Sequence, residues 1–122
     1  FVVSKIGGMD VSPGVQTDLH LNAADLAAVR VGMDRVVQSD QGTGQRARVE
    51  GLKILGKTGT AQTPRGEDHA WFVGYAPDVN PRAAIVVMLE HGGKGGANAA
   101  TIAGRVFARM KELGYFKSEG RL

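Results

Sequence analysis

The chain has 122 residues, the size of one ordinary domain or of part of a larger one. Hydrophobic residues make up 43% and charged residues 22%, which is typical of a globular domain and excludes a disordered chain. The absence of cysteine excludes a disulfide scaffold, a zinc knuckle and a cysteine nucleophile. A net charge of +3 is too small to indicate a nucleic-acid partner.

The N-terminal third predicts a short strand followed by a helix. Residues 1–6 read as a strand already under way without an initiator methionine, which we interpret as the start of a fragment cut from a longer chain. Asn22 is a natural N-cap for the helix, which we expect to end near Gln38. The helical spacing of its apolar residues predicts one buried face, made of Leu26, Val29, Met33 and Val36.

Three strand patterns and a second helix follow. Residues 49–56 alternate between apolar and polar side chains, 70–76 are rich in aromatic residues, and 83–89 form an apolar run typical of a central strand. A glycine-rich turn over 91–96 leads to the last helix, which Gly114 caps. The residues expected on the buried face of this helix are Ile102, Val106, Met110 and Leu113. Because the connections between the strands are short, the sequence predicts an α+β fold with an antiparallel sheet flanked by helices.

Residues 51–58 match the pattern G-x-x-x-x-G-K-[ST] of a phosphate-binding P-loop. That loop needs a buried strand, a glycine-rich turn whose N–H groups hold phosphate, and the start of a helix. Here the four middle positions are Leu, Lys, Ile and Leu, which extend a strand. The residues after Thr58 include Gly59, Pro64 and Gly66, which cannot begin a long helix. A P-loop nucleotide-binding protein is therefore only a remote alternative.

A second motif overlaps this one, because Lys57, Thr58 and Gly59 form the tripeptide K-T-G. K-T-G is one of three signatures of penicillin-binding proteins and serine β-lactamases. The tripeptide alone is weak evidence, but it lies within G-K-T-G-T-A-Q over residues 56–62, and H-A-W-F-V-G-Y-A-P follows over 69–77. With these strings the chain resembles the C-terminal part of the transpeptidase domain of class B (monofunctional) penicillin-binding proteins. It is most similar to the elongation-type penicillin-binding protein 2 group.

The resemblance spans most of residues 21–116, and we expect residues 1–122 to be the C-terminal part of a single transpeptidase domain. It implies the fold shared by penicillin-binding proteins and serine β-lactamases. The implied activity is that of a peptidoglycan D,D-transpeptidase, which crosslinks cell-wall stem peptides by acyl transfer through a serine ester and is acylated by β-lactams. The resemblance also implies a parent protein anchored in the bacterial inner membrane, with this domain on the periplasmic side.

The partners that the resemblance implies are peptidoglycan stem peptides, β-lactams and the missing N-terminal part of the same domain, on the same precursor or on a companion chain. We expect no nucleic acid, no metal and no cofactor. The three histidines lack metal-ligand spacing. Arg46 and Arg48 are expected to form a solvated face.

The resemblance assigns roles to four residues of the signature. Lys57 is expected to be a catalytic cation that stabilises the substrate carboxylate and assists proton transfer around the nucleophile. Thr58 is expected to hydrogen-bond the terminal carboxylate of a D-Ala-D-Ala peptide or of a β-lactam, and Gly59 to leave room for the acyl chain along the strand edge. Thr60 is expected to be both catalytic and substrate-binding, through a backbone N–H in the oxyanion hole and a side-chain contact to the carboxylate.

The other two family signatures, S-x-x-K and S-x-N, do not occur in this sequence. None of the four serines has lysine three residues on or asparagine two residues on. We therefore expect the nucleophile to lie upstream and the fragment alone to be inactive. Two alternatives with the same fold stay open: a serine β-lactamase, which hydrolyses the acyl-enzyme, and a non-catalytic β-lactam-sensing or scaffold domain.

Overall fold

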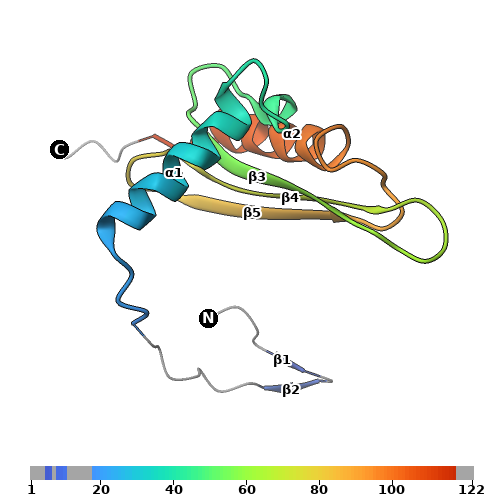
Figure 1. Cartoon of the computed structure of the whole chain (residues 1–122). Helices are drawn as coiled ribbons and strands as arrows, with labels where there is room; N and C mark the ends of the chain where they lie inside the picture. The colour runs from blue at the N-terminus through green and yellow to red at the C-terminus, as the bar shows by residue number, and fades with distance from the viewer. Residues whose placement is uncertain (1–4, 7, 11–17, 118–122) are drawn as a thin grey trace.

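The structure is a computed structural model that describes residues 5–6, 8–10 and 18–117. Three antiparallel strands form a sheet in the order β3–β4–β5, with α2 packed across one face and α1 against β3 (Figure 1). The elements in chain order are β1 (Lys5–Ile6), β2 (Met9–Asp10), α1 (Ala23–Gln38), the 3-10 turn η1 (Gln45–Ala47), β3 (Leu55–Ala61), β4 (His69–Ala76), β5 (Ala83–Leu89) and α2 (Ala99–Glu112). The α+β prediction, with an antiparallel sheet flanked by helices, is confirmed.

The strand predicted over residues 49–56 is wrong, because β3 begins only at Leu55. Before it, Gly51 adopts a φ of +65° and the chain turns back, so that Val49 and Leu52 form an isolated bridge. The apolar alternation arises because Leu52 and Ile54 are both buried although neither lies in a regular strand. Of the strand predicted over residues 1–6, the structure describes only β1, and the rest lies outside the described residues.

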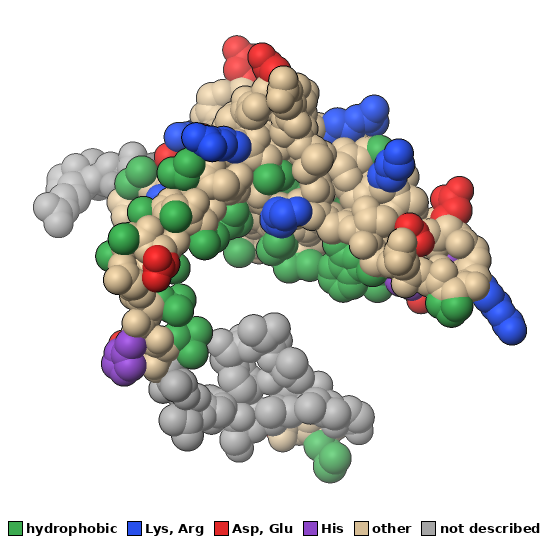
Figure 2. Space-filling view, viewed as in Figure 1, with side chains coloured by type: hydrophobic (Ala, Val, Ile, Leu, Met, Phe, Trp, Pro, Cys, Tyr) green, Lys and Arg blue, Asp and Glu red, His purple; other side chains and the backbone are tan. Residues whose placement is uncertain are grey.

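The sheet has one buried face and one exposed face. Phe72 on β4 and Phe107 on α2 are fully buried in one hydrophobic cluster, which lies between the sheet and this helix. On the opposite face Trp71, Val73 and Val86 are exposed by 38%, 44% and 64%. Figure 2 shows hydrophobic side chains gathered along the side of the sheet away from α2. In the described part of the chain β5 pairs only with β4, so a central position for residues 83–89 in the whole sheet stays a prediction.

Helix α1 starts and ends as predicted. The side chain of Asn22 accepts a hydrogen bond of 2.7 Å from the N–H of Ala24. The prediction of the buried face of α1 is wrong. Leu26 and Val29 are exposed by 44% and 59%, and the residue that the helix buries is Val37. Met33 and Val36 are half-buried, so the predicted apolar stripe is covered only toward the C-terminal end of the helix.

Helix α2 also buries a different face from the predicted one. The residues that it buries are Ala99, Ala100, Ala103, Gly104 and Phe107. A Cβ atom at Gly104 would lie 2.6 Å from the carbonyl oxygen of Arg46, so the small residues let the helix approach the η1 backbone. Ile102, Val106 and Leu113 stay exposed by 37%, 39% and 57%. The predicted cap is confirmed: Gly114 has a φ of +86°, and its N–H and that of the next residue bond carbonyls of the last turn.

Arg48 is exposed, as the sequence predicted, but it also closes the C-terminal end of α1. Its Nε donates to the carbonyl of Val37 at 2.7 Å, and its Nη2 donates to Gln38 and Ser39 at 3.0 and 2.6 Å. These carbonyls have no partner within the helix, so the guanidinium satisfies a helix end that would otherwise need water. Arg46 is exposed and reaches the carbonyl of Ala97 at 3.4 Å.

The variant Arg48→Met is expected to destabilise the protein by about 1–3 kcal/mol, since it removes charge-assisted hydrogen bonds to three carbonyls. Arg48→Lys is expected to recover little of this lost stability, because an ammonium cannot reproduce the forked set of N–H donors of a guanidinium. The matched control is Arg105→Met, at an exposed position of α2. Chemical denaturation of the purified protein measures all three, and equal stability of the two methionine variants would contradict the capping role.

Candidate functional site

The four predicted site residues lie in the middle of β3, at the free edge of the sheet. In the described part of the chain β3 pairs only with β4, so alternate backbone N–H and C=O groups of β3 point away from the sheet. Lys57 and Thr58 are inside the strand and no helix follows them, which is the opposite of a P-loop. The geometry therefore excludes the nucleotide-binding alternative for this motif.

The side chains of the motif alternate across this edge. Lys57 and Gly59 pair with Val73 and Trp71 and lie on the exposed apolar face, whereas Thr58 pairs with buried Phe72 and lies on the opposite face. The Lys57 side chain is exposed, and its Nζ donates a hydrogen bond of 2.6 Å to the carbonyl of Thr58. The edge thus offers backbone hydrogen-bonding groups with an ammonium on one side and threonine hydroxyls on the other. An extended, anionic peptide is the kind of ligand that such an edge can bind.

Gly59 lies where two other parts of the chain come close to β3. A Cβ atom here would lie 3.2 Å from the Cβ of Trp71, its partner on β4. On the other face, a Cβ atom at Gly95 would lie 2.5 Å from the carbonyl oxygen of Trp71 and nearer still to that of Gly59. The loop ahead of α2 therefore rests directly on the backbone of β3 and β4, with glycine on both sides of the contact.

Thr58 has a side-chain partner that the sequence analysis missed. Its Oγ1 lies 2.7 Å from Oγ1 of Thr43, in the loop between α1 and η1. The sequence offers only the triplet G-T-G over residues 42–44 as a signal, and nothing in its spacing points to Thr58. Thr60, two residues along the strand, is exposed.

Two histidines hold the β3–β4 connection beside the site. The backbone N–H of His91 donates to Nδ1 of His69 at 2.9 Å, and Nδ1 of His91 lies 2.8 Å from the carbonyl of Glu67. Since His69 pairs with Ala61 at the end of β3, this contact links the hairpin to the segment before α2. The described residues contain no group of three or more His, Asp or Glu side chains that could hold a metal ion.

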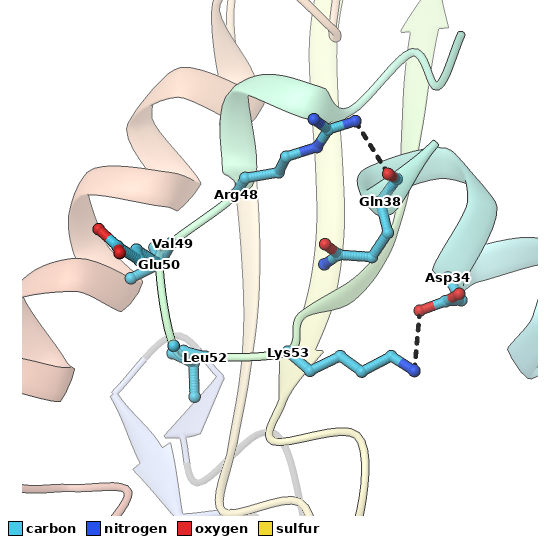
Figure 3. Close-up of a pocket in the computed structure, with 8 residues that line it drawn as sticks. Asp34, Gln38, Arg48, Val49, Glu50, Leu52 and Lys53 are labelled. Atoms are coloured by element: carbon cyan, nitrogen blue, oxygen red, sulfur yellow. Dashed lines mark hydrogen bonds and ion pairs between the residues drawn. The ribbon is translucent and has the colours of Figure 1, made fainter. Parts of the chain in front are cut away.

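A separate pocket of about 820 Å³ is lined by Asp34 and Gln38 of α1 and by residues 48–53, which precede β3 (Figure 3). Two of its polar side chains bind each other, since Lys53 Nζ lies 3.4 Å from Asp34 of α1. The same Nζ lies 3.5 Å from Asp78 of the β4–β5 turn, which is outside the pocket lining. The hydrogen bond and the charge of Asp34, and then the charge of Asp78, raise the pKa of Lys53 above its ordinary value of 10.5. We assign this pocket to the packing of α1 against the sheet.

Lys53 gives a pH prediction. Because its pKa is raised on folding, its contribution to stability is complete below pH 10.5 and is lost as the pH rises through the folded-state pKa. Wild type is therefore expected to melt above Lys53→Met at neutral pH, and the difference is expected to shrink above pH 10.5. Thermal unfolding of both proteins over this range measures it. A difference that stays constant with pH would show that the ion pairs do not stabilise the fold.

Comparison with known proteins decides the family. Residues 1–108 match the penicillin binding protein transpeptidase domain. The chain belongs to this family. The peptidoglycan D,D-transpeptidase MrdA of Haemophilus influenzae is 37% identical over 95 residues, which cover 65% of this chain and 15% of MrdA. PbpA of Mycolicibacterium smegmatis, also named a peptidoglycan D,D-transpeptidase, is 40% identical over 78 residues, which cover 57% of this chain and 16% of PbpA.

Solved structures agree with the sequence comparison. Penicillin-binding protein 2 (PBP2) from Helicobacter pylori matches 78% of this chain and 18% of its own, at 34% identity and a TM-score of 0.68. PBP2 from Pseudomonas aeruginosa, in complex with WCK 5153, matches 81% of this chain and 21% of its own, at 37% identity and a TM-score of 0.65. The predicted resemblance to the transpeptidase domain of class B penicillin-binding proteins is confirmed. The chain spans about 15% of the length of the curated relatives that it matches first.

Proposed function

We propose that this chain supplies the substrate-binding edge strand of a peptidoglycan D,D-transpeptidase. The observation that carries the proposal is G-K-T-G-T-A-Q on an exposed strand edge, in a chain that belongs to the penicillin-binding protein transpeptidase family. Residues 1–122 are then the C-terminal part of one transpeptidase domain. The serine nucleophile lies in a part of the full-length protein outside these residues. Residues 1–122 alone are therefore inactive.

The proposed reaction has two steps. The serine hydroxyl attacks the carbonyl of the penultimate D-Ala of a stem peptide, and the terminal D-Ala leaves with a proton on its amine. The amine of a neighbouring peptide then attacks the serine ester, which forms the crosslink and returns the proton to the serine. A β-lactam acylates the same serine, but its amide nitrogen stays tethered to the acyl group when the ring opens.

Within this reaction, the residues of β3 bind and orient. The positive charge of Lys57 stabilises the ligand carboxylate and assists proton transfer to and from the nucleophile. The Thr58 hydroxyl, together with the Thr60 side chain, donates hydrogen bonds to the carboxylate. The backbone N–H of Thr60 stabilises the oxyanion, and Gly59 keeps the strand edge open for the acyl chain. These roles are supported by the position of all four residues on one exposed strand.

The setting of the parent protein is part of the same proposal. We propose a protein anchored in the inner membrane, with this domain on the periplasmic side, where stem peptides and β-lactams are its ligands. In the part of the chain that the structure describes, no helix is long and apolar enough to cross a membrane. The rest of the domain is the proposed partner of the exposed apolar sheet face that contains Trp71, Val73 and Val86. A related structure is a complex of PBP2 with MreC from Helicobacter pylori.

The test is an intact-mass spectrum of the full-length protein after incubation with penicillin, followed by peptide mapping. We expect an adduct of the drug's mass on a serine outside residues 1–122, and release of D-Ala from a stem peptide when an acceptor amine is added. Rapid hydrolysis of the adduct would favour the serine β-lactamase. No adduct would favour the scaffold domain, and an adduct within residues 1–122 would overturn the assignment of the nucleophile.

A further inference from the structure

We propose that Thr43 positions the hydroxyl of Thr58 for the ligand carboxylate, so that carboxylate recognition by K-T-G depends on the loop between α1 and η1. The inference rests on the proposed function and deepens it, because it adds a residue to the carboxylate site. The observation that carries it is the distance of 2.7 Å between the two threonine Oγ1 atoms, which come from segments 15 residues apart in the sequence.

The backbone around Thr43 is held on two sides, so its hydroxyl is presented by a packed loop. The N–H of Gly42 donates to Ser39 at 2.9 Å and that of Gly44 donates to Val36 at 2.8 Å, which fixes the loop to the end of α1. A Cβ atom at Gly42 would lie 2.5 Å from the carbonyl oxygen of Arg35, at the end of that helix. A Cβ atom at Gly96, ahead of α2, would overlap the carbonyl oxygen of Thr43.

Proton counting gives the direction of the hydrogen bond when a ligand is present. Each threonine hydroxyl has one proton to donate, and an ionised carboxylate only accepts. When Thr58 donates its proton to the ligand carboxylate, the contact with Thr43 persists only with Thr43 as the donor. The order of donation is then Thr43 to Thr58 to carboxylate, in which each hydrogen bond polarises the next.

The pair is also accessible to a ligand. Thr43 is exposed and Thr58 is half-buried, on the free edge of the sheet. Thr58 lies one residue from Lys57, whose charge favours an anion at this edge. A role confined to tying the loop to β3 would not depend on the charge of the ligand, and this difference separates positioning from packing.

The experiment compares Thr43→Val, which removes the hydroxyl at nearly constant volume, with Thr43→Ser, which keeps it. The second-order rate constant of acylation of the full-length protein is measured with benzylpenicillin and with its methyl ester, which has no carboxylate. Thr43→Val is expected to slow acylation by benzylpenicillin roughly three- to tenfold and to leave the ester rate within about twofold, whereas Thr43→Ser retains the wild-type rate.

A double-mutant cycle tests whether Thr43 acts through Thr58. The double variant Thr43→Val/Thr58→Val is expected to react with benzylpenicillin no more slowly than Thr58→Val, since the second change removes a hydrogen bond that is already lost. Thr63→Val is the matched control, because the Thr63 hydroxyl bonds carbonyls within the β3–β4 connection, at 2.9 Å for Arg65. It is expected to keep the wild-type rate.

Three results would overturn the inference: an equal loss with benzylpenicillin and its ester, additive effects in the cycle, or no effect of Thr43→Val. Failure of the proposed function looks different, because the wild-type protein itself would then form no acyl-enzyme with benzylpenicillin.

Discussion

Replacing Lys57 with methionine is expected to slow acylation of the full-length protein by benzylpenicillin roughly 100- to 1,000-fold, the usual cost of losing one preorganised charge-stabilising group. The side chain is exposed and lies beside the free edge of β3, where a ligand along the strand meets it. Methionine keeps an unbranched chain of similar length but removes the positive charge. The loss is therefore electrostatic, and stability is expected to change by less than about 0.5 kcal/mol.

The matched control for this variant is Lys117→Met. Lys117 is exposed and lines a small pocket together with Pro77, which directly follows the C-terminal end of β4. The same chemical change at this position is expected to leave the acylation rate unaltered. Stopped-flow measurement of the acylation rate constant, with thermal unfolding as a check on folding, gives both quantities. If Lys57→Met were acylated at the wild-type rate, a catalytic role for Lys57 would be contradicted.

Gly95→Ala is expected to lower stability by about 3 kcal/mol, at the upper end of the cost of overpacking. The added methyl would overlap the carbonyl oxygens of Gly59 and Trp71, which belong to the paired strands β3 and β4. Backbone in a sheet cannot move aside like a flexible side chain. The loop before α2 must lift off the sheet or push Gly59 outward, so acylation by benzylpenicillin falls as well.

Gly32→Ala is the matched control, since it makes the same change in α1, where the new methyl meets no atom within 4 Å apart from its own chain neighbours and the nearby helix backbone. It is expected to be neutral or to stabilise the helix by up to about 1 kcal/mol, because alanine is the better helix former. Equilibrium denaturation and the acylation rate of the two variants form the test. If Gly95→Ala were as stable and as reactive as Gly32→Ala, the close packing of the loop on β3 would be contradicted.

Local sequence was sufficient to predict the helices α1 and α2, the strands β4 and β5, and the motif, but not the start of β3. Asn22 and Gly114 mark the start of α1 and the end of α2 because capping bonds reach only a few residues along the chain. The strands over 69–76 and 83–89 follow from runs of aromatic and β-branched residues. K-T-G and its neighbouring strings indicated the family that the comparison confirmed. The roles of the four K-T-G residues stay predictions.

Only the tertiary structure decided which faces are buried and which residues meet at the site. Helical periodicity gives the spacing of apolar residues but does not say which side of the helix packs against the protein. Helix α2 buries its small residues because they let it approach η1, and Ile102 and Val106 stay partly exposed. Arg48 bonds the carbonyls at the end of α1 only because the fold places that helix end beside it. Thr43 and Thr58 meet because the loop after α1 folds back onto β3, and no local pattern encodes a contact between segments so far apart in the chain.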